Sequence, residues 1–228
     1  MDIRDFPIPG QRSLAKVNAR HPWNHNDHFH GWILRNLPAR RRTAVDVGCG
    51  TGVLAGKLAT HFTHVTGIDR NEGMAAAASA RVRNFPQVSI HRCDFADFSS
   101  TASDGGADLI TMVAVLHHLD LVDTLARIPA LLAPGGRLLV VGLARPDSLA
   151  DLAFDVVSGA ANPVMGMIKH SRPARLPQRT PHSQPVMPIK DPATTLAEIA
   201  KAARAHLTSS TVRRRLFFRY TLRWDKPQ

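Results

Sequence analysis

Apolar residues in the middle of the chain fall into short strand-like runs separated by longer stretches with helical spacing. The strand-like runs are residues 43–47, 64–69, 88–93, 107–116 and 137–143. Between them, apolar positions recur at helical spacing, which predicts helices over residues 53–62, 74–83 and 121–132, with Asn71 as the N-cap of the second. Strands that alternate with helices form right-handed βαβ units. The pattern therefore predicts a doubly wound α/β fold with a parallel sheet.

The two flanks of the chain follow other patterns. Helices are predicted over residues 23–37 and 194–207, with helical stretches over 148–168, whereas residues 172–192 hold six of the 16 prolines and predict an irregular loop. In residues 212–224, apolar side chains recur at even spacing, at 212, 216, 218, 220, 222 and 224, with mostly Arg between, which is typical of a strand with one basic face. One long strand and a hairpin both fit, because no Gly, Pro or Asn marks a turn.

The net charge of +11 and the sequence pI near 10.9 suggest a nucleic-acid partner, until the charge is divided along the chain. Residues 1–42 carry 8 basic and 3 acidic groups, a net +5. Residues 43–144 carry 7 and 9, a net −2, and residues 145–228 carry 14 and 6, a net +8. The positive charge therefore belongs to the flanks, where arginine runs such as 40–42 and 213–215 are expected to be solvated edges.

The remaining composition indicates a soluble protein of a reducing, cytoplasmic compartment. Its two cysteines, Cys49 and Cys93, are too few for a disulfide scaffold and form no CxxC pair. No run of 18 apolar residues could span a membrane, and the start of the chain lacks the basic and apolar regions of a signal peptide.

The motif with the clearest chemistry is Val-Asp-Val-Gly-Cys-Gly-Thr-Gly at residues 45–52, between the first strand and the first helix. Its glycines let a ligand lie against bare backbone, and the helix that follows offers free N–H donors. The pattern is GxGxG, so the dinucleotide fingerprint GxGxxG is not met. Two carboxylates follow at strand ends, Asp69 after the second strand and Asp94 after the third.

Together with the segment LLAPGGRLLVVG at 131–142, these features resemble the class I S-adenosylmethionine-dependent methyltransferases over residues 40–145. The resemblance implies a mostly parallel, seven-stranded, Rossmann-like sheet with an N-terminal helix and a cap or lid insertion. The segment Val-Leu-His-His-Leu at 115–119 is similar to small-molecule methyltransferases of bacterial biosynthesis, and the two ends of the chain resemble an actinobacterial subset.

The resemblance also implies S-adenosylmethionine as the cofactor and places its sulfur end. Val113 and Ala114, late in the fourth strand, would form the wall next to the sulfonium. The residues implied to line the methionine part are Asp46, Gly48, Cys49, Gly50 and Gly52.

The adenosine half has its own implied contacts. Asp69 would hold the ribose hydroxyls, with Arg70 and Met74 close to the adenine. Asp94 would bind the adenine edge, and Phe95 its face.

His117 and His118 follow the expected methyl-donor wall and are the candidate catalytic residues. Histidine titrates near physiological pH, so it could take a proton from an acceptor hydroxyl or amine. Two structural roles compete with this one: packing against neighbours, and capping of the next helix. Methyl transfer can also proceed by positioning alone, without a general base.

The N-terminal helix is expected to close over the cofactor through Trp23, His25 and Asn26. The alternative is a polar helix start packed by its tryptophans. His25, His28 and His30 cluster there with Asp27. His25 and His28 are one helical turn apart and could supply two ligands, but no third ligand has a fixed place, so no metal site is predicted.

These inferences predict one methyltransferase domain over residues 1–228. Its expected parts are an N-terminal helical cover (1–42), a cofactor-binding core (43–144), a substrate cap or lid (145–192), and the last helix and strands (193–228). In the lid, Met165, Met167 and Ile168 would contact the acceptor. Lys169, His170, Arg172 and Arg175 would attract an anionic one.

The predicted function is in-line methyl transfer to a small-molecule acceptor, with no membrane partner. The alternative is an RNA- or DNA-directed methyltransferase, which the charge favours. Against it, the fourth strand lacks the Asn/Asp-Pro-Pro-aromatic element that grips a base amine. A non-catalytic scaffold is the third possibility, and the intact GxGxG, Asp69 and Asp94 argue against it.

Overall fold

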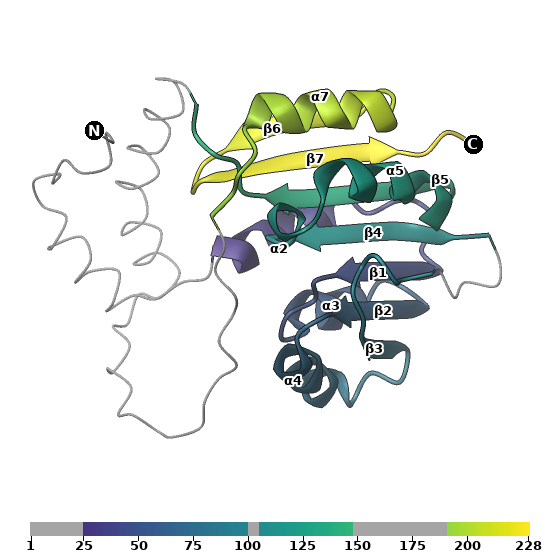
Figure 1. Ribbon diagram of the computed structural model, residues 1–228. Coiled ribbons are helices and arrows are strands. Elements are labelled where there is room, and N and C mark those ends of the chain that lie inside the picture. Colours follow the sequence, from purple (N-terminus) through teal and green to yellow (C-terminus); the bar gives the residue numbers. More distant parts are fainter. Residues whose placement is uncertain (1–24, 100–104, 148–190) are drawn as a thin grey trace, which may run out of the picture.

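The computed structural model describes residues 25–99, 105–147 and 191–228. They form a seven-stranded sheet with the order β3-β2-β1-β4-β5-β7-β6 (Figure 1). Strands β1 to β5 are parallel, and β7 inserts antiparallel between β5 and β6. The strands are β1 (Thr43–Val47), β2 (His64–Asp69), β3 (Val88–Arg92), β4 (Ala107–Val113), β5 (Leu132–Gly142), β6 (Thr211–Arg215) and β7 (Arg219–Asp225). The predicted α/β class and the mostly parallel seven-stranded sheet are confirmed.

The helices follow the predicted order, with shifted ends. They are α2 (His25–Arg35), α3 (Val53–Leu58), α4 (Glu72–Val82), the 3₁₀ turn η2 (Leu116–His118), α5 (Leu121–Leu131) and α7 (Leu196–His206). Asn71 caps α4 as predicted, accepting a hydrogen bond from the Met74 N–H at 3.0 Å. The helix predicted to reach residue 62 ends at Leu58, and the strand predicted to reach residue 116 ends at Val113.

Alternate residues of the central strands enter two separate hydrophobic cores, one on each face of the sheet. Val45, Ile110 and Leu138 belong to the core under α5 and α7. Ala44 and Leu109 belong to the core under α2 and α3. This alternation explains why these strands read as continuous apolar runs, since both faces are buried.

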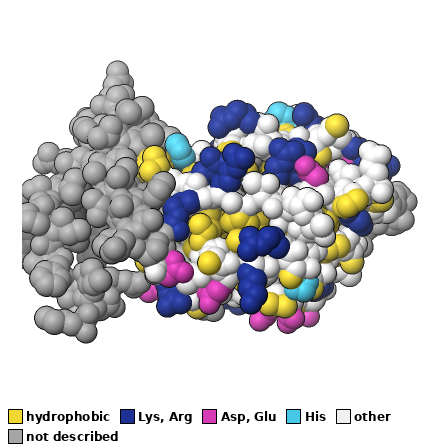
Figure 2. All heavy atoms as spheres, turned by 90° about the horizontal axis from the view of Figure 1, so that it is seen from above, with side chains coloured by type: hydrophobic (Ala, Val, Ile, Leu, Met, Phe, Trp, Pro, Cys, Tyr) yellow, Lys and Arg dark blue, Asp and Glu magenta, His cyan; other side chains and the backbone are white. Residues whose placement is uncertain are grey.

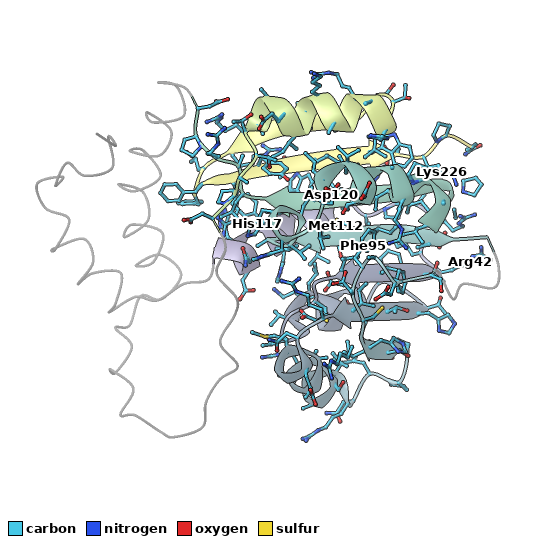
Figure 3. The ribbon with its side chains drawn as sticks, in the orientation of Figure 1. Arg42, Phe95, Met112, His117, Asp120 and Lys226 are labelled. Atoms are coloured by element: carbon cyan, nitrogen blue, oxygen red, sulfur yellow. The ribbon has the colours of Figure 1, made fainter. Side chains whose placement is uncertain are left out.

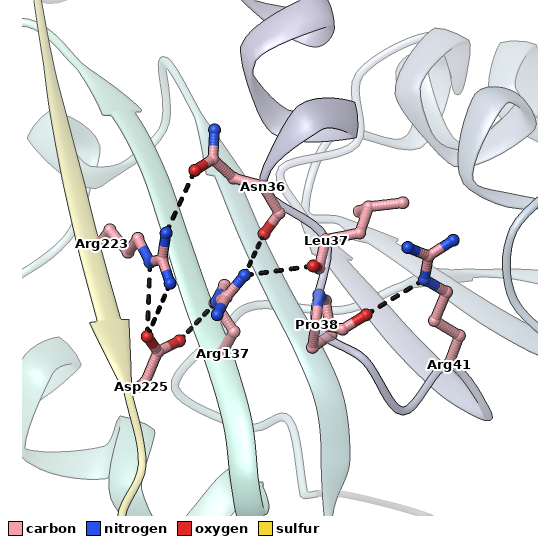
Figure 4. Close-up of polar contacts among 7 residues, drawn as sticks. All are labelled: Asn36, Leu37, Pro38, Arg41, Arg137, Arg223 and Asp225. Atoms are coloured by element: carbon pink, nitrogen blue, oxygen red, sulfur yellow. Dashed lines mark hydrogen bonds and ion pairs between the residues drawn. The ribbon is translucent and has the colours of Figure 1, made fainter.

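Helix α2 is tied to the sheet near its carboxyl end by an arginine network (Figure 4). Arg137 of β5 donates to the carbonyl of Asn36 at 2.6 Å and forms an ion pair with Asp225. Arg223 of β7 donates to the Asn36 side chain at 3.3 Å and pairs with Asp225 at 2.9 Å. Arg223 of the basic C-terminal flank and Arg137 of the central segment therefore both hold the fold together.

The C-terminal segment, for which the sequence allows one long strand or a hairpin, forms the hairpin of β6 and β7. Its turn places Phe217 and Phe218 in the left-handed backbone region, at φ 62° and 59°. Left-handed backbone costs a residue with a side chain roughly 1–2 kcal/mol. Phe217 is buried and lies edge-on to His28 of α2, with ring centres 5.3 Å apart, so packing offsets that cost.

At the other end of the sheet, a buried carboxylate joins β4 to the start of β1. The Asp108 side chain is 1% exposed and accepts hydrogen bonds from the N–H groups of Arg42 at 2.7 Å and Thr43 at 3.2 Å. It also forms an ion pair with Arg40. The Arg40 side chain is 45% exposed, so it stays at a solvated edge, as expected for this arginine run, and adds an ion pair there.

We expect Asp108→Ala to lower the free energy of unfolding by about 3–5 kcal/mol, because it leaves buried N–H groups without an acceptor. Urea unfolding followed by circular dichroism measures this change. Glu72→Ala is the control, since Glu72 pairs with Arg92 at an exposed site and its loss should change little. Equal effects of the two substitutions would contradict the structural role of Asp108.

Within the described ranges, no helix has the length and apolar character needed to cross a membrane.

Candidate functional site

A cavity opens at the carboxyl ends of the parallel strands, where the loops after β1, β2, β3 and β4 meet. His117, which follows β4, lies at this end of the sheet, and Arg42 and Lys226 lie at the opposite end (Figure 3). In doubly wound sheets, ligands bind at this edge, where the strand order reverses. The reversal here falls between β1 and β4, directly beside the glycine-rich loop. Many of the predicted cofactor residues line the cavity: Asn26, Asp46, Gly48, Cys49, Gly50, Asp69, Arg70, Met74, Asp94, Phe95, Val113 and Ala114.

The glycine-rich loop needs glycine for two different reasons. At Gly48, φ is +65° and an added Cβ would come within 2.5 Å of the Val115 side chain. At Gly50, φ is +54° and nothing lies within 4 Å of an added Cβ. Gly48 therefore permits close packing of the loop on the segment after β4, and Gly50 presents open backbone to the cavity.

Asp46 is a buried carboxylate with one unused oxygen. Its Oδ1 accepts a hydrogen bond from the Thr111 hydroxyl at 2.8 Å, and its buried Oδ2 has no partner within the described part of the chain. Burial, with a smaller contribution from the negative charge of Asp69, raises the pKa of Asp46 to about 7. A cationic ligand group in the cavity would supply the missing partner.

Asp69 organises the loop after β2. One carboxylate oxygen accepts from the Gly50 N–H and the other from the Asn71 N–H, each at 2.9 Å. Each oxygen still has a second lone pair, so the carboxylate can accept a pair of hydroxyl groups while it holds the loop.

Asp94 and Phe95 are held by a residue that sequence reasoning missed. Arg127 of α5 donates to the carbonyls of Phe95 at 2.6 Å and Phe98 at 2.8 Å, and its guanidinium lies 5.1 Å from the centre of the Phe95 ring. Phe95 is 5% exposed and lines the cavity, so only a small part of its ring is open to a ligand. An arginine inside a predicted helix carries no sequence signal for this role, because its partners are backbone carbonyls.

The wall after β4 has an unusual backbone. Ala114 adopts φ +53°, and its N–H donates to the Val141 carbonyl at 2.7 Å. His118 lines the cavity, whereas His117 does not belong to the lining and packs on His118, with ring centres 4.1 Å apart. Asp120, and neither histidine, caps α5 by accepting from the Asp123 N–H at 2.9 Å.

Helix α2 supplies the other side of the cavity through Asn26, Asp27 and His30. His30 is buried, and its Nδ1 lies 3.1 Å from the Lys57 ammonium of α3. The sequence suggests a role for Asp27 and His30 only in a metal cluster and gives no sign that they line this cavity. Within the ranges that the structure describes, no group of three or more His, Cys, Asp or Glu side chains could hold a metal ion.

Other predicted site residues lie elsewhere. Gly52 precedes α3 and is not part of the lining. Trp23 lies outside the described residues, as do the side chain of His25 and the predicted lid contacts at 165–175. Their roles stay predictions.

Comparisons with known proteins identify the family. A family model described as a methyltransferase domain matches residues 45–138. An uncharacterized methyltransferase of Mycobacterium tuberculosis is 32% identical over 211 residues, which cover 90% of this chain and 98% of that protein. A ubiquinone biosynthesis O-methyltransferase of Aromatoleum aromaticum is 34% identical over 110 residues, 46% of each chain.

Among solved structures, the N-methyltransferase NodS of Bradyrhizobium japonicum in complex with S-adenosyl-L-homocysteine shares the fold, with a TM-score of 0.56. It is 19% identical, and the match covers 95% of this chain and 98% of NodS. The mycobacterial relative matches almost end to end, and the glycine loop, Asp69 and Asp94 meet in one cavity. The chain belongs to the class I S-adenosylmethionine-dependent methyltransferases.

Proposed function

We propose that this methyltransferase acts on a small-molecule acceptor. The observation that carries the proposal is the position of α2, whose Asn26, Asp27 and His30 line the same cavity as the glycine-rich loop. A cavity bounded on both sides by the chain suits a small acceptor better than a nucleic-acid strand. The similarity to a ubiquinone biosynthesis O-methyltransferase supports the same class of acceptor.

The described residues fit S-adenosylmethionine, the cofactor of the family. The unused Oδ2 of Asp46 offers a buried negative partner to a cationic group. The open backbone at Gly50 leaves room for a ligand, and the Asp69 carboxylate can accept the two ribose hydroxyls. When bound, the cofactor supplies a methyl group on a cationic sulfonium, which the acceptor takes by in-line displacement to leave S-adenosylhomocysteine.

The residues of the chain would contribute mainly by positioning. Ala114 and Val113 form the cavity wall after β4, and α2 covers the opposite side. Holding two reactants in line can contribute roughly 7–11 kcal/mol to the lowering of a barrier. His118, which lines the cavity, would accept the proton that the acceptor loses, and His117, which packs on it, would act as a positioning residue. We also propose the predicted division of the chain, with 43–144 as the cofactor-binding core and 145–192 as the substrate cap.

We expect His118→Ala to lower kcat about 100-fold with unchanged cofactor affinity, because it removes the general base from the cavity. His117→Ala, which removes the packing neighbour, should lower kcat by a few-fold at most. Release of S-adenosylhomocysteine measures both rates. An unchanged rate in His118→Ala would show that the acceptor needs no base.

We expect Arg127→Met to raise the Kd for S-adenosylmethionine about tenfold, because it removes two charged hydrogen bonds that hold the loop of Asp94. Calorimetry should show the same loss with adenosine, since this loop would face the adenosine half. Arg92→Met is the control, because Arg92 has the same charge and its partner Glu72 lies at an exposed site. Equal losses in the two variants would refute a positioning role for Arg127.

The nucleic-acid alternative is tested by the salt dependence of RNA and DNA retention. Figure 2 views the molecule from the side of α7 and the β6–β7 hairpin, and Lys and Arg outnumber Asp and Glu on this face. Such a surface should retain RNA at about 50 mM salt and release it at about 200 mM, as counterion-driven binding does. Tight retention at the higher salt concentration would favour the alternative.

A further inference from the structure

Two arginines face each other across the β6–β7 hairpin. Arg215 and Arg219 are directly paired in the ladder, so their side chains leave the same face of the sheet. Like charges in this position destabilise a sheet. Arg215 donates from its Nε to the Thr221 hydroxyl at 3.0 Å, and no carboxylate pairs with either arginine among the described residues.

Arg219 is half-buried, and part of its hydrogen-bonding capacity is unused. Its Nη2 donates to the Asn26 side chain at 3.0 Å, and its Nη1 makes longer contacts with the turn carbonyls. Its Nε is buried without a hydrogen-bond partner in the described part of the chain. Burial also lowers the pKa of Arg219 to about 10, so the cationic form is held there at a cost. Buried charges in proteins normally have an opposite charge beside them.

Neither arginine is part of the cavity lining, but Arg219 reaches the edge of the cavity through Asn26. Asn26, which accepts from Arg219, lines the cavity. The N–H of Ala114 bonds to Val141 of β5. Strand β7 pairs with β5 up to the Gly142–Tyr220 pair, and Arg219 is the neighbour of Tyr220 in β7. Two strand spacings therefore separate the Ala114 wall from Arg219, roughly 10 Å. A small molecule can bridge that distance.

We propose that Arg215 and Arg219 form an oxyanion site that binds a carboxylate or phosphate group of the acceptor. This inference rests on the proposed small-molecule function and extends it to a substrate class. The guanidinium fork suits planar carboxylates and phosphates alike. The ladder register keeps both arginines on one face, and the Phe217–Phe218 turn beside them packs on α2 through the contact of Phe217 with His28.

Calorimetry on the full chain saturated with S-adenosylhomocysteine tests the site. The probes are benzoate, its neutral analogue benzamide, and inorganic phosphate. We expect at least one anion to bind with a Kd of about 1 mM or below and benzamide not to bind measurably. The anion that binds distinguishes a carboxylate site from a phosphate site. Arg219→Gln should weaken anion binding at least tenfold, roughly the effect of one charged hydrogen bond.

Arg223→Gln is the matched control. Arg223 lies four residues along the same strand and bonds Asn36, directly after α2, but its charge is paired with Asp225 at 2.9 Å. Loss of Arg223 should therefore leave anion binding unchanged. If Arg219→Gln does not fold, Arg215→Gln provides the same test, because Arg215 bonds Thr221 rather than α2.

Three results would overturn the inference: no anion binding by the wild type, equal binding of benzamide, or equal losses in the Arg219 and Arg223 variants. A purely structural Arg219 would change cofactor affinity and thermal stability without changing the preference for anions. A wild-type protein that binds S-adenosylhomocysteine but no anion would refute the anion site and leave the proposed function standing. Methylation of RNA in place of any small molecule would refute the proposed function.

Discussion

Asp46→Asn is expected to raise the Kd for S-adenosylmethionine about 100-fold. The substitution keeps the shape of the side chain and an oxygen that can accept from Thr111, but it removes the negative charge from the buried Oδ2 position. A charge-assisted contact in a desolvated site contributes on the order of 3 kcal/mol, which corresponds to that ratio. Calorimetric titration measures the change, and an affinity equal to that of wild type would show that Asp46 does not face the cofactor.

The same carboxyl makes cofactor binding depend on pH. Asp46 has a pKa of about 7 in the folded chain without ligand. A cationic cofactor group favours the ionised form, so affinity should fall by up to tenfold for each pH unit below about 7. The Asn variant should lack this slope. Equal slopes in wild type and variant would assign the pH dependence to another group.

The free energy of unfolding should depend on pH in the opposite direction from cofactor affinity, and fall as the pH rises. The pKa of Asp46 is raised on folding from 3.8, so the unfolded chain ionises first as the pH rises. The cost to the folded state is absent below about pH 4, grows up to about pH 7 and is constant above it. Asp46→Asn should therefore be more stable than wild type at pH 8, by at most about 4 kcal/mol, and no more stable at pH 4. Thermal unfolding at the two pH values measures the difference.

The second large effect is expected for Asp69→Ala, which should raise the Kd for S-adenosylmethionine about 100-fold. It removes the carboxylate edge proposed for the ribose and leaves the Gly50 and Asn71 N–H groups without their acceptor. Asp69→Asn keeps one acceptor oxygen, so its loss should be about tenfold.

The control for Asp69 is Asp97→Ala, which removes an exposed carboxylate outside the cavity lining. Its affinity should equal that of wild type. Adenosine should lose as much affinity as the whole cofactor in the Asp69 variant, since the ribose belongs to that half. A loss seen with Asp97→Ala as well would indicate a general charge effect instead of a contact.

The order of strands and helices was predictable because both faces of the central strands are buried. Val45 and Ala44 enter opposite cores, and this double burial produces the apolar runs seen in the sequence. Element ends were less predictable. Strand β5 begins at Leu132 rather than at 137, since an irregular pairing with β4 extends it through the Pro-Gly-Gly segment that resembles a helix stop.

The hairpin could not be predicted from turn chemistry. Hairpin turns with left-handed residues favour Asn and Gly, and here the positions hold Phe217 and Phe218. Burial of Phe217 against His28 offsets the backbone cost, and that contact joins residues far apart in the chain. Local sequence therefore carries no sign of it.

The candidate site was predictable where a motif places residues at strand ends, and less so where contacts cross the chain. The glycine loop, Asp69 and Asp94 meet as the motif implies. Arg127 and Arg219 act through backbone carbonyls or a side-chain amide, so they have no sequence signature. The same holds for the basic flanks, whose arginines include structural ones such as Arg223 and the facing pair on the hairpin.

The fate of a labelled methyl group tests the small-molecule function most directly. The protein would be incubated with methyl-labelled S-adenosylmethionine and a deproteinised bacterial extract that contains both metabolites and nucleic acid, and the products would be separated by size. We predict label in the low-mass fraction, resistant to nuclease and lost in Asp69→Ala. Label that stays with RNA or DNA and is released by nuclease would contradict the account.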